Sequence, residues 1–399
     1  MNKRIFGLPR NIFFLGLTSL LNDFSSEMVF SVFPAFFTSV LKAGAQSLGL
    51  VDGIAEAASN FFKIYSGSLS DRFQNRKPLV VAGYALSVAT RPFYILVSTV
   101  SGALGLRFLD RVGKGLRDSP RDAIISLSTP REELGRSFGY HRAMDTTGAI
   151  LGPLVAYVLL SYFPLRFDVV FVTAFVVGVL ALLTLVFITD VARSRASTTR
   201  VGFVASFKGL SFQFKFFLLS IFVLSMGSLP IAVMLLRTQS IGLAIADIPL
   251  FYAVYNISYA GLSFAAGKMS DRIGARTTIF VGYLFLVLSY GVLAFAHSVF
   301  TLLVGFLLLG LFPALTDGVQ RSLAAQLTPD GLRGGGLGWL NAATGLGALL
   351  AGIGGGYLWQ TYSPAVAFAA ASAIVFVGLI LFAVSGRSKL ASKLRTDQR

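Results

Sequence analysis

The sequence contains no cysteine and few ionisable side chains for its length. Its 399 residues include 2 His, so a disulfide scaffold, a thiolate nucleophile, a cysteine-ligated zinc or iron–sulfur site and a multi-histidine metal centre are all excluded. Charged residues make up 13% of the chain, whereas a soluble domain usually carries about 25%. We therefore expect no resident metal and no other cofactor.

Apolar residues are abundant instead. Hydrophobic residues account for 55% of the sequence, and its mean hydropathy is +0.74. Twelve membrane spans of about 20 residues each would need about 240 residues, which is close to this apolar content. The composition excludes a water-soluble enzyme of this size, a disordered chain and a fibrous chain. It indicates an all-α integral membrane protein.

Twelve apolar stretches are long enough to cross a bilayer. The first follows a basic N-terminus that resembles a signal peptide, but it continues past Asp23 and no small-residue cleavage site follows, so we predict an uncleaved span. The predicted spans are residues 12–41, 46–70, 78–98, 100–122, 137–161, 165–189, 214–237, 247–269, 277–297, 299–327, 336–360 and 364–385.

Basic residues gather at one side of these spans. The net charge is +16, and most Lys and Arg residues of the loops lie at the N-terminus, after the even-numbered spans and in the C-terminal tail. Because cytoplasmic loops are enriched in Lys and Arg, both termini are predicted to be cytoplasmic. We expect a multi-pass protein of the cell (inner) membrane, and no nucleic-acid partner.

An internal repeat divides the chain into two halves. Residues 67–77 read GSLSDRFQNRK and residues 267–277 read GKMSDRIGART, which share G-x-x-S-D-R-x-x-x-R. Repeated halves with a binding site between them near the bilayer midplane are the layout of many secondary transporters. The predicted units are an N-terminal six-helix bundle over 1–189, a cytoplasmic linker over 190–213, a C-terminal six-helix bundle over 214–386 and a basic cytoplasmic tail over 387–399.

Three motifs are similar to those of a known family. They are the 67–77 loop, which departs from the family pattern at Gln74 and Asn75, the RFLDRVGKG stretch of span 4, and the GAILGP stretch of span 5. Together they resemble the signatures of the major facilitator superfamily (MFS). The resemblance implies a transporter of twelve transmembrane helices in two pseudo-symmetric six-helix bundles. The span 5 motif, with Gly148, Gly152 and Pro153 as a predicted hinge, is similar to an element common in exporters of that family.

The two copies of the repeated motif are candidate gating loops. Gly67, Asp71, Arg72 and Arg76 belong to the first copy, and Gly267, Asp271 and Arg272 to the second. In one interpretation, the basic residues neutralise a helix C-terminus and bind lipid phosphate. In the other, which the resemblance also implies, Asp71 contacts a helix N-terminus or an arginine in one conformation only and acts as a latch.

Carboxylates inside the first two spans are candidate proton carriers. Asp23 lies about 16 Å along the first span, and Glu27 follows one turn later on the same face. A charge at this depth costs at least ~3 kcal/mol, so these groups must face a cavity, pair with a cation or take up a proton. They either form fixed ion pairs or bind and release a proton as the cavity alternates. Asp52 and Glu56 repeat the spacing in span 2.

Span 4 carries a stripe of charge that must face the protein interior, because a lipid-facing stripe would be untenable. The residues concerned are Arg107, Asp110, Arg111, Lys114, Asp118 and Arg121, with Arg117 beside them. In one interpretation, the carboxylates Glu27, Asp52, Asp110 and Asp145 simply balance these cations. In the other, the arginines hold a substrate carboxylate or phosphate through paired hydrogen bonds.

Four further polar residues have structural as well as functional interpretations. Arg91 in span 3 is either a cavity residue or the structural partner of a carboxylate in span 1 or 2. We expect His141 at the surface or as a helix cap, with a proton relay as the alternative. Asp317 and Arg321, four residues apart, are expected to form a structural ion pair.

These observations favour a secondary active transporter that works by alternating access, and no enzymatic activity. No G-x-x-x-x-G-K-[ST] motif is present, so ATP is not the direct energy source. The leading hypothesis is proton-coupled efflux of an amphipathic compound. The alternatives are an organic-anion, metabolite or siderophore-type permease and, in another class, a non-transporting membrane sensor. The expected partners are a small-molecule substrate, a proton and the lipid bilayer, and the protein is expected to be a monomer.

Overall fold

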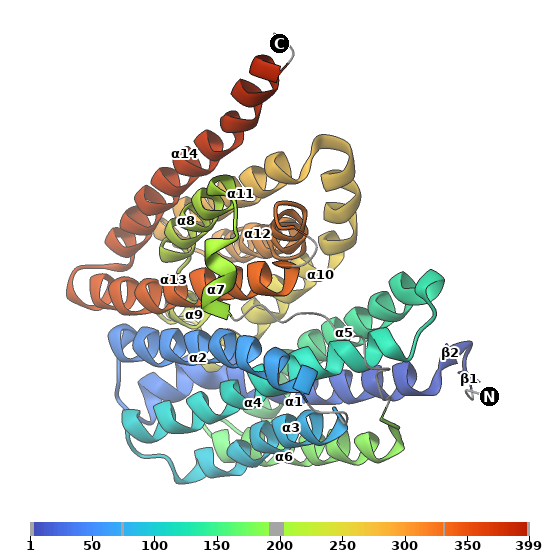
Figure 1. The fold of residues 1–399 in the computed structure, drawn as a ribbon. Helices are drawn as coiled ribbons and strands as arrows, with labels where there is room; N and C mark the ends of the chain where they lie inside the picture. Colours follow the sequence, from blue (N-terminus) through green and yellow to red (C-terminus); the bar gives the residue numbers. More distant parts are fainter. Residues whose placement is uncertain (1–3, 73–75, 191–202, 330–331, 397–399) are drawn as a thin grey trace.

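The computed structural model describes residues 4–72, 76–190, 203–329 and 332–396, and this part of the chain is almost entirely helical (Figure 1). A short antiparallel pair of strands, β1 (Arg4–Ile5) and β2 (Leu8–Pro9), precedes the first helix. The helices are α1 (Arg10–Ser39), α2 (Ala45–Arg72), α3 (Lys77–Phe93), α4 (Val100–Leu127), α5 (Leu134–Tyr162), α6 (Phe167–Thr184), α7 (Phe203–Lys208), α8 (Phe212–Met226), α9 (Ile231–Gln239), α10 (Ile248–Ile273), α11 (Ala275–Ala294), α12 (Val299–Gln326), α13 (Arg333–Thr361) and α14 (Pro364–Thr396). Single 3₁₀ turns lie at Tyr94–Leu96, Arg131–Glu133, Leu185–Phe187 and Ile245–Asp247.

The predicted spans agree closely with these helices. The exception is the seventh span, which is broken where α8 ends at Met226 and α9 begins at Ile231, directly after Pro230. Proline lacks the N–H that a continuous helix would need there. Other helix ends follow capping side chains: the Thr99 hydroxyl accepts from the Gly102 N–H at 3.2 Å before α4, and Ser298 forms a capping box with Thr301 before α12.

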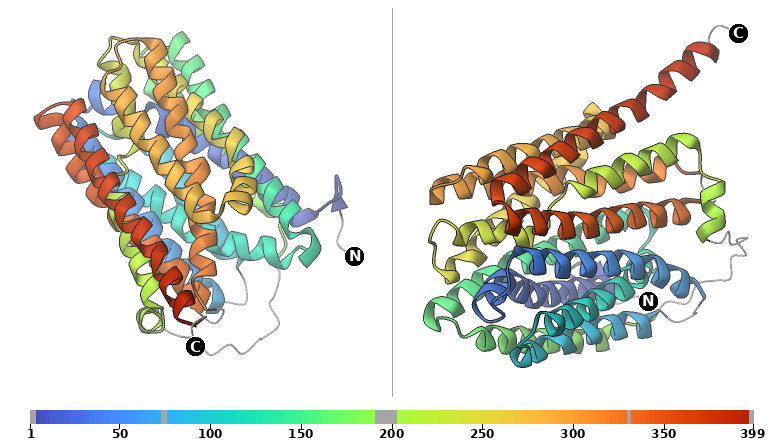
Figure 2. Two further views of the ribbon diagram at one scale, coloured as in Figure 1. Left: turned by 90° about the horizontal axis from the view of Figure 1, so that it is seen from above. Right: turned by 90° about the vertical axis from the view of Figure 1, so that its left-hand side faces the viewer.

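The helices fall into two groups that follow the order of the sequence. Helices α1–α6 pack against one another, as do α8–α14, and Figure 1 shows the first group below the second. Figure 2 shows the long helices of both groups running side by side. The groups meet mainly where α2 packs against α13 and α5 against α10.

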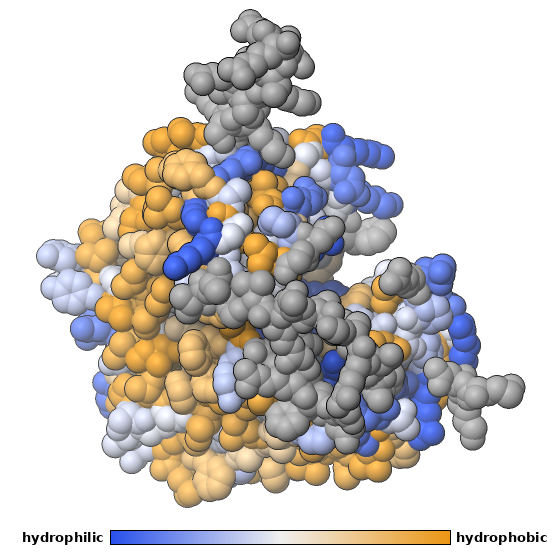
Figure 3. Space-filling view, viewed as in Figure 1, coloured by the Kyte–Doolittle hydropathy of each residue, from blue (hydrophilic) through white to orange (hydrophobic). Residues whose placement is uncertain are grey.

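Eight helical segments of the described chain are long and apolar enough to cross a membrane: α3, α5, α6, α8 with α9, and α11 to α14. Helices α1, α2, α4 and α10 are 30, 28, 28 and 26 residues long but more polar. Figure 3 shows apolar side chains spread over the flank of the molecule, as expected of a surface that faces lipid. The polar residues on α1, α2, α4 and α10 indicate a cavity in the interior of the protein.

The predicted linker contains the short helix α7. Residues 191–202 lie outside the described part of the chain, but the Phe203 ring stacks on the Trp339 indole of α13, with ring centroids 4.4 Å apart. The predicted tail begins at residue 387, whereas the backbone of α14 continues as a helix to Thr396.

Glycines let α2 and α13 approach closely at the end of the molecule where α2 begins. A Cβ atom on Gly352 would lie 2.3 Å from the carbonyl oxygen of Gly49, and a Cβ atom on Gly49 would meet the Gly352 carbonyl oxygen at the same 2.3 Å. Only a residue without a Cβ atom allows this separation. At the same end, the Gln239 amide donates to the Thr38 hydroxyl at 3.0 Å. The two groups of helices are therefore in direct contact there.

We expect Gly352→Ala to destabilise the protein, because the added methyl group meets backbone that cannot rotate away. Overpacking of this kind costs about 1–3 kcal/mol. Gly354→Ala is the matched control on the same helix, since a Cβ atom at Gly354 has no neighbour within 4 Å. Thermal unfolding of the two variants in detergent measures the difference. Equal unfolding temperatures would contradict the prediction.

Candidate functional site

A cavity of about 630 Å³ lies between the two groups of helices and is lined by both. Its lining includes Asp122 near the end of α4 and Arg321 near the end of α12, so it extends toward the face at which α1 begins. The contact between α2 and α13 lies toward the opposite face. One wall comes from α1, α2, α4 and α5, and the other from the connection between α8 and α9 and from α9 to α13.

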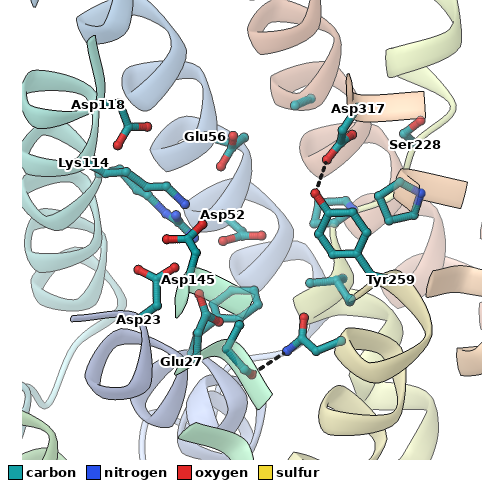
Figure 4. Close-up of a pocket in the computed structure, with 18 of the residues that line it drawn as sticks. Asp23, Glu27, Asp52, Glu56, Lys114, Asp118, Asp145, Ser228, Tyr259 and Asp317 are labelled. Atoms are coloured by element: carbon teal, nitrogen blue, oxygen red, sulfur yellow. Dashed lines mark hydrogen bonds between the residues drawn. The ribbon is translucent and has the colours of Figure 1, made fainter. Parts of the chain in front are cut away.

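Two glycines of the predicted span 5 hinge position an acidic pair in this cavity. A Cβ atom on Gly148 would lie 2.3 Å from the Leu20 carbonyl oxygen, and one on Gly152 would lie 2.6 Å from that of Phe24. This close approach of α5 to α1 brings the Asp145 carboxyl beside the Asp23 carboxyl (Figure 4). Pro153 is buried in the same part of α5.

The hydrogen bonds of the acidic pair come from both helices. The Ser19 hydroxyl donates to Asp145 Oδ1 at 2.5 Å, and the Arg142 guanidinium forms an ion pair with Asp145 Oδ2 at 3.2 Å. The Asn22 side chain donates to Asp23 Oδ1 at 3.2 Å. No ion pair joins Asp23 to a cation among the described residues. The pair therefore holds two carboxyl groups beside one directly bound cation.

Glu27 reaches across to the second group of helices. The Tyr252 hydroxyl of α10 donates to Glu27 Oε2 at 2.7 Å. Tyr252, Tyr255 and Tyr259 follow helical spacing on α10, and all three line the cavity. The rings of Tyr252 and Tyr255 are stacked with centroids 5.8 Å apart. The second wall is thus aromatic at this point.

Two cations of the predicted span 4 stripe face the cavity and form no ion pair or hydrogen bond with a described residue. Lys114 lies among Asp23, Glu56 and the other labelled carboxylates in Figure 4, but it forms no ion pair or hydrogen bond with another described residue. The Arg111 guanidinium likewise donates to no described residue, and its Cζ atom lies 5.9 Å from the centre of the Phe30 ring. Among the described residues, the Glu56 carboxylate accepts one long hydrogen bond of 3.4 Å, from the Asn60 amide.

Toward the face at which α1 begins, the charges are paired. Asp118 lies 3.5 Å from both Lys63 and Arg121, and Arg121 also pairs with Asp122 at 3.0 Å. Arg117 donates to the Ser87 hydroxyl at 2.8 Å, and its guanidinium lies 4.5 Å from the centre of the Tyr84 ring. This part of the stripe is held in place by neighbouring helices of the same group.

Three of the predicted cavity residues, Arg91, Arg107 and Asp110, lie outside the cavity lining. Arg107 is 4% exposed, pairs with Asp52 at 3.0 Å and Asp110 at 3.5 Å, and stacks on Phe30 at 4.5 Å. Arg91 is 2% exposed and donates to the Asn22 amide oxygen at 2.9 Å and the Ser25 hydroxyl at 2.5 Å. These partners are neutral side chains, whereas the structural interpretation predicted that Arg91 pairs with a carboxylate of span 1 or 2.

Two sequence-based expectations are wrong. His141 is 5% exposed, because α5 packs its first turns against neighbouring helices, whereas a surface or capping position was expected. Asp317 accepts a hydrogen bond from the Tyr259 hydroxyl at 3.0 Å, and no ion pair joins it to Arg321 in the described chain. Spacing of four residues permits an ion pair, but a side chain from another helix competes for the same acceptor.

No site role was predicted from the sequence for the tyrosines of α10 or for Arg142. The spacing of Tyr252, Tyr255 and Tyr259 by three and four residues was the available signal, since it places three hydroxyl groups on one helical face. Arg142 stands next to His141 and three residues before Asp145, a spacing that allows the observed ion pair.

The gating loops are described only in part. The side chains of Asp71 and Arg72 lie outside the described residues. Gly67 lies in α2 near Ser119 of α4, and Arg76 is 3% exposed. In the second copy, Gly267, Asp271 and Arg272 are exposed near the end of α10, which Gly274 terminates with φ +89°. The latch at Asp71 stays a prediction.

The sequence and the fold match those of known proteins. A family model described as Major Facilitator Superfamily matches residues 15–236 and 216–397. The chain belongs to the major facilitator superfamily. The transporter is 34% identical over 385 residues to the MFS-type transporter MJ1317 of Methanocaldococcus jannaschii, and the match covers 94% of both chains. It is 25% identical over 361 residues to the multidrug resistance protein MdtH of Photorhabdus laumondii, covering 88% of this chain and 86% of the relative.

Solved structures share the fold at low identity. A mutant of the nucleoside transporter NupG superposes with a TM-score of 0.81 at 14% identity, covering 94% of the transporter and 99% of that chain. A bacterial homologue of the human lysosomal transporter Spinster, in an inward-facing and unoccupied conformation, superposes with a TM-score of 0.73 at 15% identity over 95% and 97% of the two chains. The transporter thus has the all-α integral membrane fold that its sequence predicts, and it is not an enzyme.

Proposed function

We propose that the transporter moves an amphipathic organic compound out of the cell by alternating access, driven by proton uptake in the cavity. The contrast between the two walls of the cavity carries this proposal. The first wall presents Asp23, Glu56 and Lys114, and the second presents the α10 tyrosines with Met234 and Phe312. A compound with one polar and one apolar part matches both walls.

The Asp23–Asp145 pair supports proton coupling. Two charged carboxylates in contact repel each other, and binding one proton removes most of that repulsion. Both side chains line the cavity, so a proton that enters the cavity can reach them. The pair lies beside the cavity cations and so responds to the charge of a bound compound.

The direction of transport follows from three observations. The distribution of Lys and Arg favours a cytoplasmic location for the face toward which the cavity extends. The GAILGP motif brings α5 against α1 and is similar to an exporter element. The relative from Photorhabdus laumondii is named a multidrug resistance protein. These support uptake of substrate from the cytoplasmic side and release outside, with the bundles of residues 1–189 and 214–386 moving about the linker.

Transport assays in proteoliposomes test the proposal. Purified transporter is reconstituted, and the flux of a panel of neutral, cationic and anionic amphipathic compounds is followed with and without an imposed pH gradient. We expect accumulation of at least one compound that a protonophore abolishes. Flux that ignores the pH gradient would contradict the coupling, and absence of flux across the panel would contradict the substrate class.

Arg111 and Lys114 favour a second candidate, the transport of organic anions. Because neither cation has a direct partner among the described residues, a substrate carboxylate would complete their hydrogen bonds. We expect Arg111→Gln to weaken the binding of an anionic compound by about tenfold or more and to leave a neutral analogue unaffected. Arg166→Gln is the control, since Arg166 pairs with Asp168 at 2.7 Å and does not line the cavity. Equal affinities in both variants, measured by isothermal calorimetry, would exclude the anion site.

A further inference from the structure

A chain of polar contacts crosses from α5 to α10 and α12 at the edge of the cavity. The Arg142 guanidinium donates to the Tyr259 hydroxyl, and the Tyr259 hydroxyl donates to Asp317 Oδ2 at 3.0 Å. The guanidinium also lies 5.1 Å from the centre of the Tyr259 ring. Arg142 belongs to the first group of helices and Tyr259 and Asp317 to the second, so these contacts tie the two groups together.

The same guanidinium binds the acidic pair. Arg142 Nη1 lies 3.2 Å from Asp145 Oδ2, and the Asp145 carboxyl lies beside that of Asp23 (Figure 4). Arg142 is therefore shared between the pair on its own side and a tyrosine on the other side. A guanidinium can serve both, because its N–H groups point in different directions within one plane.

We propose that Arg142 couples the charge of the Asp23–Asp145 pair to the contact between the two halves of the transporter, an inference that rests on the proton coupling proposed above. With one proton on the pair, its net charge of −1 balances the guanidinium, which keeps its bond to Tyr259. When the proton leaves to the cavity, two charged carboxylates attract the guanidinium toward α1 and α5. The bond to Tyr259 then breaks, and the contact between α5 and α10 is weakened, with the Asn256 amide still donating to the Ala149 carbonyl oxygen at 2.9 Å.

Other charged groups surround the pair. Glu27 lies on α1, Lys114 and Arg121 on α4, His141 on α5 and Asp317 on α12. Lys114 and Arg121 belong to the same half as the pair, so a change in their contacts does not alter the connection between halves. Of these cations, Arg142 is the one that donates to the other half within the described chain. His141 is titratable as well and needs its own variant.

The absence of cysteine makes a distance measurement direct. Gly135→Cys at the start of α5 and Gln326→Cys at the end of α12 place two spin labels on exposed positions of the face toward which the cavity extends. A Cβ atom at Gly135 has no neighbour within 4 Å. Pulsed electron paramagnetic resonance on the full chain in lipid nanodiscs then reports the distribution of distances at acidic and alkaline pH, without any substrate.

Tyr259→Phe is the principal variant, because it removes only the hydroxyl that joins Arg142 to Asp317. Tyr255→Phe is the matched control on the same face of α10, since the Tyr255 hydroxyl has no hydrogen bond to another described residue. Arg142→Lys keeps the charge beside Asp145 but lacks the planar fork with which the guanidinium reaches both partners. His141→Gln removes the neighbouring titratable ring.

In the wild-type protein, we expect raised pH to shift the distances away from the described arrangement. Tyr259→Phe and Arg142→Lys are expected to shift the equilibrium between the two arrangements about tenfold away from the described one already at acidic pH. In both variants the distances should then depend less on pH. Tyr255→Phe and His141→Gln should behave like the wild type.

Wild-type pH dependence in Tyr259→Phe would overturn the role of Arg142 and leave the proposed function standing, provided that the pH gradient still drives flux. Loss of the pH dependence of the distances in His141→Gln would assign that dependence to the histidine, and this result would also overturn the proposed role of Arg142. Distances that ignore pH in the wild-type protein would overturn both this coupling and the proton-driven part of the proposed function.

Discussion

Asp23→Asn is expected to abolish accumulation of substrate against its gradient, while exchange of substrate across the membrane persists. The asparagine amide has the size of the carboxyl group but cannot lose a proton, so it holds the site in one charge state. Asp145 then keeps its bonds to Ser19 and Arg142 without a charged neighbour. Coupled flux requires that the site alternates between two charge states.

Flux of one compound through reconstituted Asp23→Asn, measured with a pH gradient and separately as exchange, distinguishes the two processes. Asp168→Asn is the control, because Asp168 pairs with Arg166 at 2.7 Å and does not line the cavity. Glu27→Gln is measured beside it, since Glu27 is the other carboxylate predicted in span 1. If both Asp23→Asn and Glu27→Gln accumulate substrate like the wild type, proton coupling in α1 is excluded.

Arg107→Ala is expected to cause the largest loss of stability. The guanidinium pairs with Asp52 and Asp110, and its side chain is only 5% exposed. Removing it leaves two largely buried carboxylates without their cation, which costs about 3–5 kcal/mol. Arg107→Lys keeps one charge and should lose much less, although it gives up the planar stack on Phe30.

Thermal unfolding and substrate affinity are measured on both Arg107 variants. Because Arg107 lies outside the cavity lining, the affinity of a folded Arg107→Lys protein is expected to equal that of the wild type. Arg166→Ala serves as the control, since it removes an exposed ion pair at the start of α6 and should have little effect. A stable Arg107→Lys protein with weakened substrate binding would return Arg107 to the substrate site.

The sequence alone predicted which helices carry the chemistry. Charged residues spaced along span 4 had to face the interior, because the bilayer leaves no water for a charged surface. Gly148 and Gly152 predicted a special role for span 5, and the structure places both against the α1 backbone. These inferences depend on the spacing of residues within one helix, which can be read directly from the sequence.

Which charges meet depends on how the helices are rotated and tilted against one another. Arg107 and Lys114 lie on one stripe of α4, yet Arg107 is paired with Asp52 and Lys114 faces the cavity. Asp317 lies four residues from Arg321 but bonds to Tyr259, which belongs to α10. No local pattern contains these partners, since they lie about 55 to 60 residues apart along the chain.

The sequence by itself determined the membrane class, the helical segments, the repeat and the interior position of the charges, because hydropathy and helical spacing are local properties. The tertiary structure alone decided that Asp23 meets Asp145, that Arg142 reaches Tyr259, and that Arg111 and Lys114 remain without a direct partner among the described residues. The physical reason is that each of these outcomes depends on the contact of helices from distant parts of the chain, where a shift of one helical face exchanges one partner for another.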